Sequence, residues 1–300
     1  MRIGIVGAGA IGLSFAAALS RAHDVALLVR RSAVAEAIAR DGIAVAGPDE
    51  SEFVRVAAAA DPRAMADRDA IIVAVKSFAT RDALAPLHGI LAPHALVASV
   101  QNGIDNAADA RAVLPENRVV AGSTMFGAIK LGDGAVRPVI ISGATIFERN
   151  ASAAPTSDEL AAAFVAAGLE ARVVDDIAPV LWRKLIVNAA INPLGALARR
   201  PNGAIASDRD LSELGKGLAR EAGTVASAAG VDVGDPWEAV EAAARATAAN
   251  RNSMLQDLDA GRPSEIEAIA GAIVRRAGEH GIAVPLTHAM LRLVRARERA

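Results

Sequence analysis

The chain has 300 residues, of which 53% are hydrophobic and 22% charged, and this is typical of a globular protein with about two domains of roughly 150 residues each. The absence of cysteine excludes disulfides, thiolate metal sites and a cysteine nucleophile. The absence of tyrosine excludes the phenolic acid/base of many small carbonyl reductases. A net charge of -2 provides no overall basic field for nucleic acid or an anionic membrane, so neither is expected as a partner.

An uncharged run near the start, Ile3 to Ser20, resembles a signal peptide or a membrane span. The glycines within it argue against both, because they cluster where a strand would turn into a helix. We therefore expect no targeting segment and a cytoplasmic protein.

The first half of the chain alternates short β-branched apolar runs with Ala-rich stretches, a pattern that predicts a parallel sheet covered by helices. Glycines at intervals within residues 126–148 predict antiparallel hairpins at one edge of that sheet. A helix over residues 158–167 and a closing strand over 170–174 should complete it. The predicted parallel strands cover residues 2–6, 24–29, 70–75, 95–100 and 118–122.

The second half is rich in Ala, Leu, Glu and Arg and predicts helices almost throughout. We place the domain boundary near Asp175. The predicted helices cover residues 178–198, 208–229, 236–260 and 264–280.

A glycine-rich turn follows the first predicted strand and opens a helix: Gly7, Ala8, Gly9, Ala10, Ile11 and Gly12. In this context the glycines permit a tight turn, close approach of the backbone to a pyrophosphate and close packing of helix on strand. The alternative is a turn that only needs small residues. The prediction is an α/β fold, with a Rossmann-type dinucleotide-binding domain over residues 1–174 and an all-helical domain over 175–300.

The residues after the second predicted strand indicate which dinucleotide binds. An NAD site favours a carboxylate there for the ribose hydroxyl, whereas Arg30 and Arg31 suit the 2′-phosphate of NADP. A solvated basic turn would look the same. Lys76, after the strand at 70–75, and Asn102, after the strand at 95–100, lie where ligands bind in parallel sheets, although an ordinary surface loop has similar residues.

Lys184, Asn188 and Asn192 recur at every fourth position and share one face of an otherwise aliphatic helix. Because unsatisfied polar groups among aliphatic side chains cost about 1–3 kcal/mol each, this row should face a ligand or form interhelical hydrogen bonds. A lysine in such surroundings is a candidate acid/base. Glu265, after the expected helix cap Ser264, is a candidate to orient it, or simply an acid favoured by the helix dipole.

No histidine lies at metal-ligand spacing, so no metal site is predicted. Each of the five histidines is read as a surface or capping residue.

Several motifs in order along the chain make it resemble the ketopantoate reductases, also called 2-dehydropantoate 2-reductases. The resemblance covers nearly the whole chain. In that family a Rossmann domain precedes a helical domain, and the active site lies in the cleft between them. The motifs are Leu181-Trp182-Arg183-Lys184-Leu185, Val187-Asn188, Ile191-Asn192-Pro193-Leu194, Pro201-Asn202-Gly203, Ser253-Met254-Leu255-Gln256-Asp257, Ser264-Glu265-Ile266 and Gly281-Ile282-Ala283-Val284-Pro285.

The resemblance implies roles for individual residues. Lys184 matches the general acid, and Glu265 the carboxylate that contacts the cofactor and the lysine. Ser264 stands where the family usually has Thr, and Glu267 where it usually has Asp, and neither change removes a functional group. Substrate would contact Asn102, Lys184, Asn188, Asn192, Asn202 and Ser253, and NADPH would contact Gly7 to Gly12, Arg30, Lys76, Asn102, Ala128 and Glu265.

The implied activity is NADPH-dependent reduction of 2-dehydropantoate to pantoate, as in pantothenate and coenzyme A biosynthesis. Two alternatives stay open: reduction of another branched 2-oxo acid on the same fold, and NADPH sensing without turnover. The small-molecule substrate is the expected partner. The sequence does not determine the oligomeric state, and a homodimer is compatible with it.

Overall fold

The chain divides into two compact units. The structure, a computed structural model, describes residues 1–47, 50–140, 143–150 and 154–299. Residues 1–101 and 106–177 form the first unit, and residues 102–105 join the chain from 178 onward in the second. The predicted boundary lies three residues before this division. The inclusion of 102–105 in the helical unit was not predicted.

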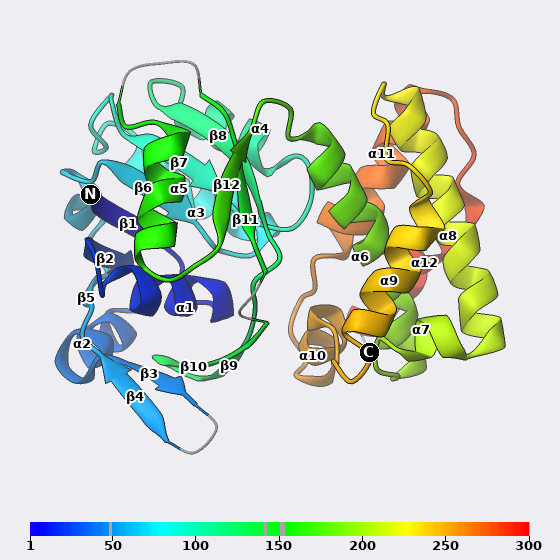
Figure 1. Cartoon of the computed structure of the whole chain (residues 1–300), viewed down its shortest axis with the longest axis horizontal. Helices are drawn as coiled ribbons and strands as arrows, with labels where there is room; N and C mark the ends of the chain where they lie inside the picture. The colour runs from blue at the N-terminus through cyan, green and yellow to red at the C-terminus, as the bar shows by residue number, and fades with distance from the viewer. Residues whose placement is uncertain (48–49, 141–142, 151–153, 300) are drawn as a thin grey trace. The chain divides into compact units, whose positions relative to one another are not determined.

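The first unit is built on a sheet of eight strands in the order β12, β11, β8, β7, β6, β1, β2, β5 (Figure 1). The six strands from β8 to β5 run parallel, and β11 pairs antiparallel with β8. This confirms the predicted parallel sheet of a Rossmann-type unit. The strands are β1(Arg2–Val6), β2(Asp24–Leu28), β5(Ala57–Ala59), β6(Ala70–Val73), β7(Leu96–Ser99), β8(Arg118–Thr124), β11(Thr145–Glu148) and β12(Ala171–Val174).

Five helices accompany this sheet within the described residues. Helix α5 begins one residue before the predicted start, where Thr156 and Glu159 form a reciprocal capping box. The others follow strands, as crossover connections between parallel strands require. The helices are α1(Ala10–Leu19), α2(Ser32–Asp41), α3(Thr80–Leu84), α4(Asn106–Val113) and α5(Ser157–Ala166).

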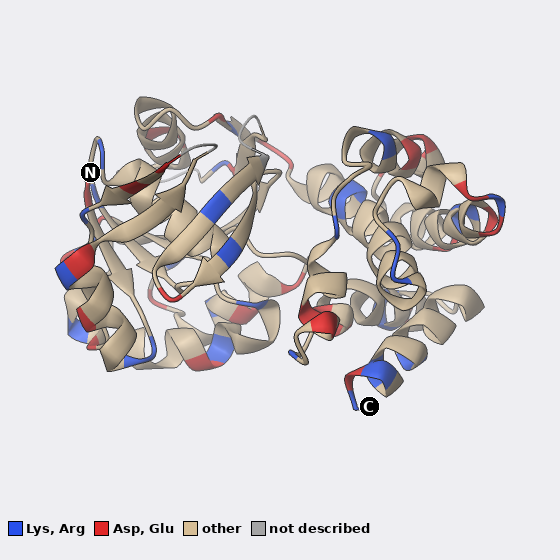
Figure 2. Cartoon of the chain, turned by 90° about the horizontal axis from the view of Figure 1, so that it is seen from below, with Lys and Arg blue, Asp and Glu red and all other residues tan. Residues whose placement is uncertain are grey.

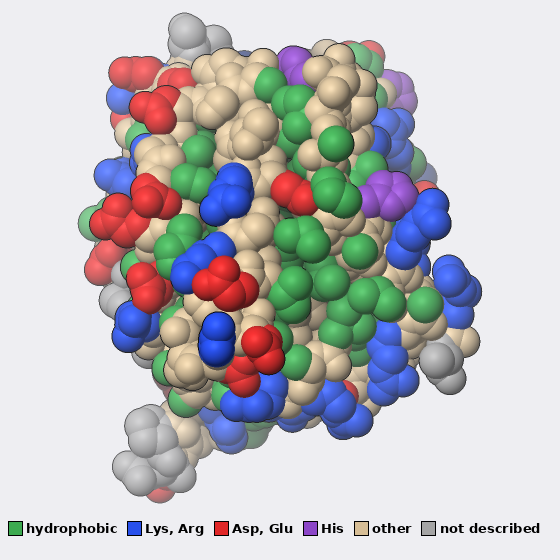
Figure 3. All heavy atoms as spheres, turned by 90° about the vertical axis from the view of Figure 1, so that its right-hand side faces the viewer, with side chains coloured by type: hydrophobic (Ala, Val, Ile, Leu, Met, Phe, Trp, Pro, Cys, Tyr) green, Lys and Arg blue, Asp and Glu red, His purple; other side chains and the backbone are tan. Residues whose placement is uncertain are grey.

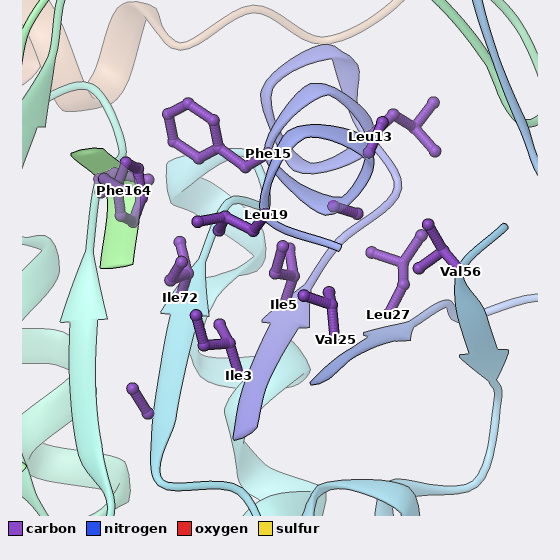
Figure 4. Packing of buried hydrophobic residues seen from close by; sticks show 14 of the residues in the cluster. Ile3, Ile5, Leu13, Phe15, Leu19, Val25, Leu27, Val56, Ile72 and Phe164 are labelled. Atoms are coloured by element: carbon purple, nitrogen blue, oxygen red, sulfur yellow. The ribbon is translucent and has the colours of Figure 1, made fainter. Parts of the chain in front are cut away.

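The core of the first unit lies between the sheet and helix α1. Leu13, Phe15 and Leu19 of α1 are fully buried, and they lie above aliphatic side chains of β1, β2 and β6 (Figure 4). Phe15 also contacts Phe164 of α5, with ring centroids 5.0 Å apart. Helices α1 and α5 therefore cover the same face of the sheet.

A second sheet corrects the prediction for residues 126–148. Strands β9(Gly127–Gly132) and β10(Ala135–Ile140) form the expected hairpin, but it joins β3(Ile43–Ala46) and β4(Ser51–Val54) instead of the edge of the main sheet. The antiparallel strand that this stretch does add to the main sheet is β11, which pairs with β8. Residues 141 and 142 of this stretch lie outside the described residues.

The second unit is helical, as predicted, and α6 is its central helix. Helix α6 packs against α8, α9, α10 and α12. Figure 3 shows hydrophobic side chains gathered on one face of this unit, with charged side chains around them. The helices are α6(Ala178–Ala198), α7(Ala204–Ser207), α8(Arg209–Ala228), α9(Pro236–Ala246), α10(Ser253–Asp259), α11(Ala272–Glu279) and α12(Pro285–Glu298).

Two long predicted helices are interrupted in the structure. The stretch 236–260 forms α9 and α10 because the residues between them pair with the Asn202-Gly203 turn. The backbone amide of Asn202 donates to the Asn250 carbonyl at 2.9 Å. Asn252 then caps α10 by accepting from the Leu255 amide at 2.9 Å. The stretch 264–280 begins with a π-helical segment, Glu267–Gly271, before α11.

Charged residues of both signs are interspersed along the elements of each unit (Figure 2). Among the described residues, no helix is both long and apolar enough to cross a membrane.

We predict that Phe164→Ala lowers the free energy of unfolding by about 3–5 kcal/mol, because the ring is fully buried against Phe15 and Phe147. Val165→Ala, the next position of α5, is the matched control: this side chain is 58% exposed, and the change should stay within about 0.5 kcal/mol. Urea denaturation of both variants measures the difference. Equal losses would contradict the assignment of Phe164 to the core.

Candidate active site

The glycine-rich turn joins β1 to α1 at the carboxyl edge of the parallel strands. Gly7 has φ of +112°, and a Cβ there would lie 2.7 Å from the Val75 side chain. A Cβ at Gly12 would lie 1.9 Å from the Gly7 carbonyl oxygen. The fold itself therefore requires glycine at both positions.

Gly9 is different, because the protein leaves space beside it. A Cβ at this position would meet only the Ala74 carbonyl oxygen, at the ordinary contact distance of 3.6 Å. Gly9 caps α1 without a side-chain hydrogen bond, and residues 7–11 are half-buried. A glycine that the fold does not need, at a helix N-terminus, fits a ligand phosphate that approaches the backbone closely.

Two basic residues follow the strands on either side of β1 at this edge. Arg30 follows β2 and is exposed, and it makes no ion pair among the described residues. Arg31, which the sequence grouped with it, binds Asp133 at 2.6 Å. Lys76 follows β6 and is half-buried. The structure thus separates the two arginines and leaves Arg30 as the one suited to a ligand.

The loop that carries Lys76 is held by a residue whose structural role was not predicted. Gln101 is buried, and its amide donates to the Val75 carbonyl at 2.9 Å and to the Thr80 hydroxyl at 2.7 Å. Ala128 lies in β9, which packs against α1.

The predicted polar row lies on α6 of the helical unit. Lys184 and Asn188 are half-buried and Asn192 is buried, while Leu185 and Ile186 beside them belong to the core. Burial lowers the pKa of Lys184 to about 8, and the negative charge of Glu265 opposes this shift. At pH 7 an amine with this pKa is about ten to one protonated, so it can donate a proton.

Glu265 and Asn102 are brought together in the helical unit. The Asn102 side-chain amide donates to Glu265 Oε2 at 2.9 Å, and Glu265 is buried. Both Asp105 carboxylate oxygens are bound by α11, at 2.9 Å to Arg275 and 2.7 Å to Arg276. The structure therefore places Asn102 beside Glu265 and reveals Asp105 as a residue that secures the loop of Asn102.

Asn202 and Ser253 lie elsewhere in the helical unit. The side-chain amide nitrogen of Asn202 donates to the Thr247 hydroxyl at 2.9 Å, whereas the buried Oδ1 of the same side chain has no hydrogen-bond partner among the described residues. Ser253 is exposed at the first position of α10. The backbone pairing of Asn202 with Asn250 joins the two segments that carry these residues.

The expected cap at Ser264 is found in a different form. Its hydroxyl accepts from the Ile266 amide at 3.3 Å and donates to Glu298 at 2.7 Å. Within the described ranges, His, Asp and Glu do not gather in groups of three that could hold a metal ion.

Comparison with known protein families finds a match in each of the two units. The model of ketopantoate reductase PanE/ApbA matches residues 3–151, and the model of its C-terminal domain matches residues 176–298. The chain belongs to the ketopantoate reductase family. It is therefore an oxidoreductase of the 2-dehydropantoate 2-reductase type.

Relatives cover the whole chain. The 2-dehydropantoate 2-reductase of Halobacterium salinarum is 34% identical over 302 residues, which is 100% of this chain and 99% of that protein. That of Archaeoglobus fulgidus is 32% identical, over 99% of this chain and 98% of that protein.

Solved structures show the same architecture. The crystal structure of a PanE/ApbA family ketopantoate reductase from Ralstonia eutropha has a TM-score of 0.91 at 33% identity, covering 100% of this chain and 99% of the other. D-mandelate dehydrogenase, solved with NADH and anilino(oxo)acetate, also has a TM-score of 0.91, over 100% of this chain and 99% of the other. At 24% identity it shows a shared fold alone.

We predict that Glu265→Gln lowers the pKa of Lys184 below about 8, because the carboxylate charge favours the ammonium form while the amide retains an acceptor for Asn102. NMR titration of labelled lysine can resolve this, since the chain has four lysines. Glu238→Gln, at an exposed position of α9, should leave the titration unchanged. An unchanged or raised Lys184 pKa in Glu265→Gln would show that the two groups do not interact.

Proposed function

We propose that this protein reduces 2-dehydropantoate to pantoate with NADPH. The observation that carries the proposal is the Lys184 ammonium: its pKa is lowered to about 8 by burial, and it lies under the influence of the Glu265 carboxylate. The family assignment of both units supports the reaction type. The choice of 2-dehydropantoate as substrate rests on the family assignment and the polar residues of the helical unit. The choice of NADPH as cofactor rests on Arg30 and Gly9.

When bound, the cofactor supplies a hydride, which forms a new C–H bond at C2 of the 2-oxo acid. The π electrons of the carbonyl move to its oxygen, and that oxygen takes a proton from Lys184 Nζ. Lys184 then regains a proton from solvent. Polarisation of the carbonyl by the ammonium before transfer, followed by proton donation, is general acid catalysis with a pKa close to neutral pH.

The other predicted residues have supporting roles in this proposal. Glu265, fixed by Asn102, keeps Lys184 protonated and oriented. Asn188 and Asn192, which follow Lys184 on α6, and Asn202 and Ser253 would hydrogen-bond the carboxylate and hydroxyl of the substrate. Positioning of this kind converts binding energy into rate.

The choice of NADPH rests on the residues after β2. Arg30 is exposed and without an ion pair in the described part of the chain, so its guanidinium can bind a 2′-phosphate. The space beside Gly9 supports close approach of the pyrophosphate to the start of α1.

We predict that Lys184→Ala lowers kcat with 2-dehydropantoate by about 10²–10⁴-fold while NADPH binding persists, since the variant lacks the proton donor. Lys216→Ala, at a half-buried lysine of α8 paired with Glu213, should retain full activity. Steady-state NADPH oxidation and NADPH fluorescence titration measure the two effects. Near wild-type turnover in Lys184→Ala would refute the proton-donor role.

A panel of 2-oxo acids tests which substrate the protein reduces and whether it turns over at all. The wild type should oxidise NADPH fastest with 2-dehydropantoate. A clear preference for another branched 2-oxo acid would favour the alternative reductase, and tight NADPH binding without oxidation by any 2-oxo acid would favour a sensor.

We predict that Arg30→Ala raises the KM for NADPH by about 10–100-fold and leaves that for NADH nearly unchanged, because a charge-assisted hydrogen bond contributes about 1.5–3 kcal/mol. Arg31→Ala is the matched control, since Arg31 is already paired with Asp133. If Arg31→Ala had the larger effect, or both cofactors were affected equally by Arg30→Ala, the assignment of Arg30 to the phosphate would be wrong.

A further inference from the structure

The segment that carries Glu265 is held from both sides by helix α12. Arg295 and Glu298 lie one turn apart on α12, at i and i+3, so they share a face of the helix. Glu298 binds Ser264, which directly precedes Glu265, and Arg295 binds Glu267, two residues after Glu265. We propose that Arg295 and Glu298 are positioning residues that fix the Glu265 carboxylate in the place where it acts on Lys184. This inference rests on the proposed function.

On the N-terminal side, a single carboxylate oxygen gathers two donors. Glu298 Oε1 accepts from the Ser264 backbone amide at 2.8 Å and from the Ser264 hydroxyl at 2.7 Å. The same hydroxyl accepts from the Ile266 amide at 3.3 Å. Ser264 is buried and Glu298 is exposed, so these bonds are partly shielded from water. Backbone atoms before and after Glu265 are thus connected to one side chain of α12.

On the C-terminal side, Arg295 binds Glu267 through two parallel hydrogen bonds. Its Nη2 donates to Oε2 at 2.8 Å, and its Nε donates to Oε1. The arginine holds the pKa of the Glu267 carboxyl below its usual range. A bidentate pair fixes orientation as well as distance, because both groups are planar.

The backbone between these contacts departs from the ordinary α-helix. Glu267–Gly271 is π-helical, and such segments are rare and often lie at functional sites. Gly271 is part of the arrangement, because a Cβ there would lie 2.9 Å from Glu267 Oε2. The Glu265 carbonyl accepts from the amides of Ala268 and Ile269, both at 3.1 Å. Glu265 therefore lies at the start of an irregular turn that side-chain contacts flank on both sides.

A positioning role and a purely stabilising role predict different results. The side chains of Arg295 and Glu267 are 43% and 50% exposed, and an exposed ion pair contributes about 0–1 kcal/mol to stability. Loss of the pair should leave the fold intact. A displacement of about 1 Å in a catalytic group can nevertheless cost about 10²-fold in rate. The contacts should matter for turnover much more than for unfolding.

We predict that Arg295→Ala and Glu298→Ala each lower kcat about tenfold or more, with little change in the KM for NADPH and in Tm. Glu298→Gln retains an acceptor for Ser264 and should restore most of the activity. Arg292→Ala removes an exposed arginine of the same helix and should behave as wild type. The pKa of Lys184, measured by lysine NMR, should fall in Arg295→Ala and Glu298→Ala. In Glu298→Gln and Arg292→Ala it should stay at about 8.

Wild-type kcat and an unchanged Lys184 titration in Arg295→Ala and Glu298→Ala would overturn the inference. Loss of kcat only in proportion to loss of folded protein, with Glu298→Gln as impaired as Glu298→Ala, would also overturn it. Lys184→Ala in the same series separates this inference from the proposed function. If Lys184→Ala stayed active, the proton-donor role would fail, whereas the NMR titration would still report whether α12 positions Glu265.

Discussion

Burial lowers the pKa of a lysine, and a nearby carboxylate raises it. In the helical unit these two opposing effects meet at Lys184. Burial alone would push the pKa downward, and Glu265 limits the fall so that the group titrates at about 8. The position of Glu265 therefore decides how much of the lysine is protonated at neutral pH. Much of the surrounding polar structure is arranged around that carboxylate.

Three sets of contacts determine where the carboxylate lies. Asn102 donates to it directly, and Asp105 binds the loop of Asn102 to two arginines of α11. Helix α12 holds the residues on either side of it. A buried carboxylate needs such hydrogen-bond partners, because an unsatisfied polar group away from water costs free energy. The polar contacts thus determine where the Glu265 side chain lies.

In the first unit the corresponding constraint is steric. Gly7 and Gly12 are required by the chain itself, since a Cβ at either would collide with neighbouring atoms. Gly9 meets no such constraint, and this distinguishes a glycine that serves the fold from one that leaves room for a ligand. The sequence pattern alone treats all three alike. Only the distances around each Cβ position separate their roles.

The sequence by itself determined five of the six parallel strands from β8 to β5, helix α6 with its polar row and the family of the chain, because periodicity and contiguous motifs are local properties. It missed the short strand β5. It failed where long-range contacts decided the outcome: the β9–β10 hairpin joined β3, and the Asn202 turn interrupted the helix predicted over 236–260. Only the tertiary structure paired Arg31 with Asp133, Asp105 with α11 and Ser264 with Glu298. These partners lie 102, 170 and 34 residues apart, and side chains so distant in sequence leave no local pattern from which their contact could be predicted.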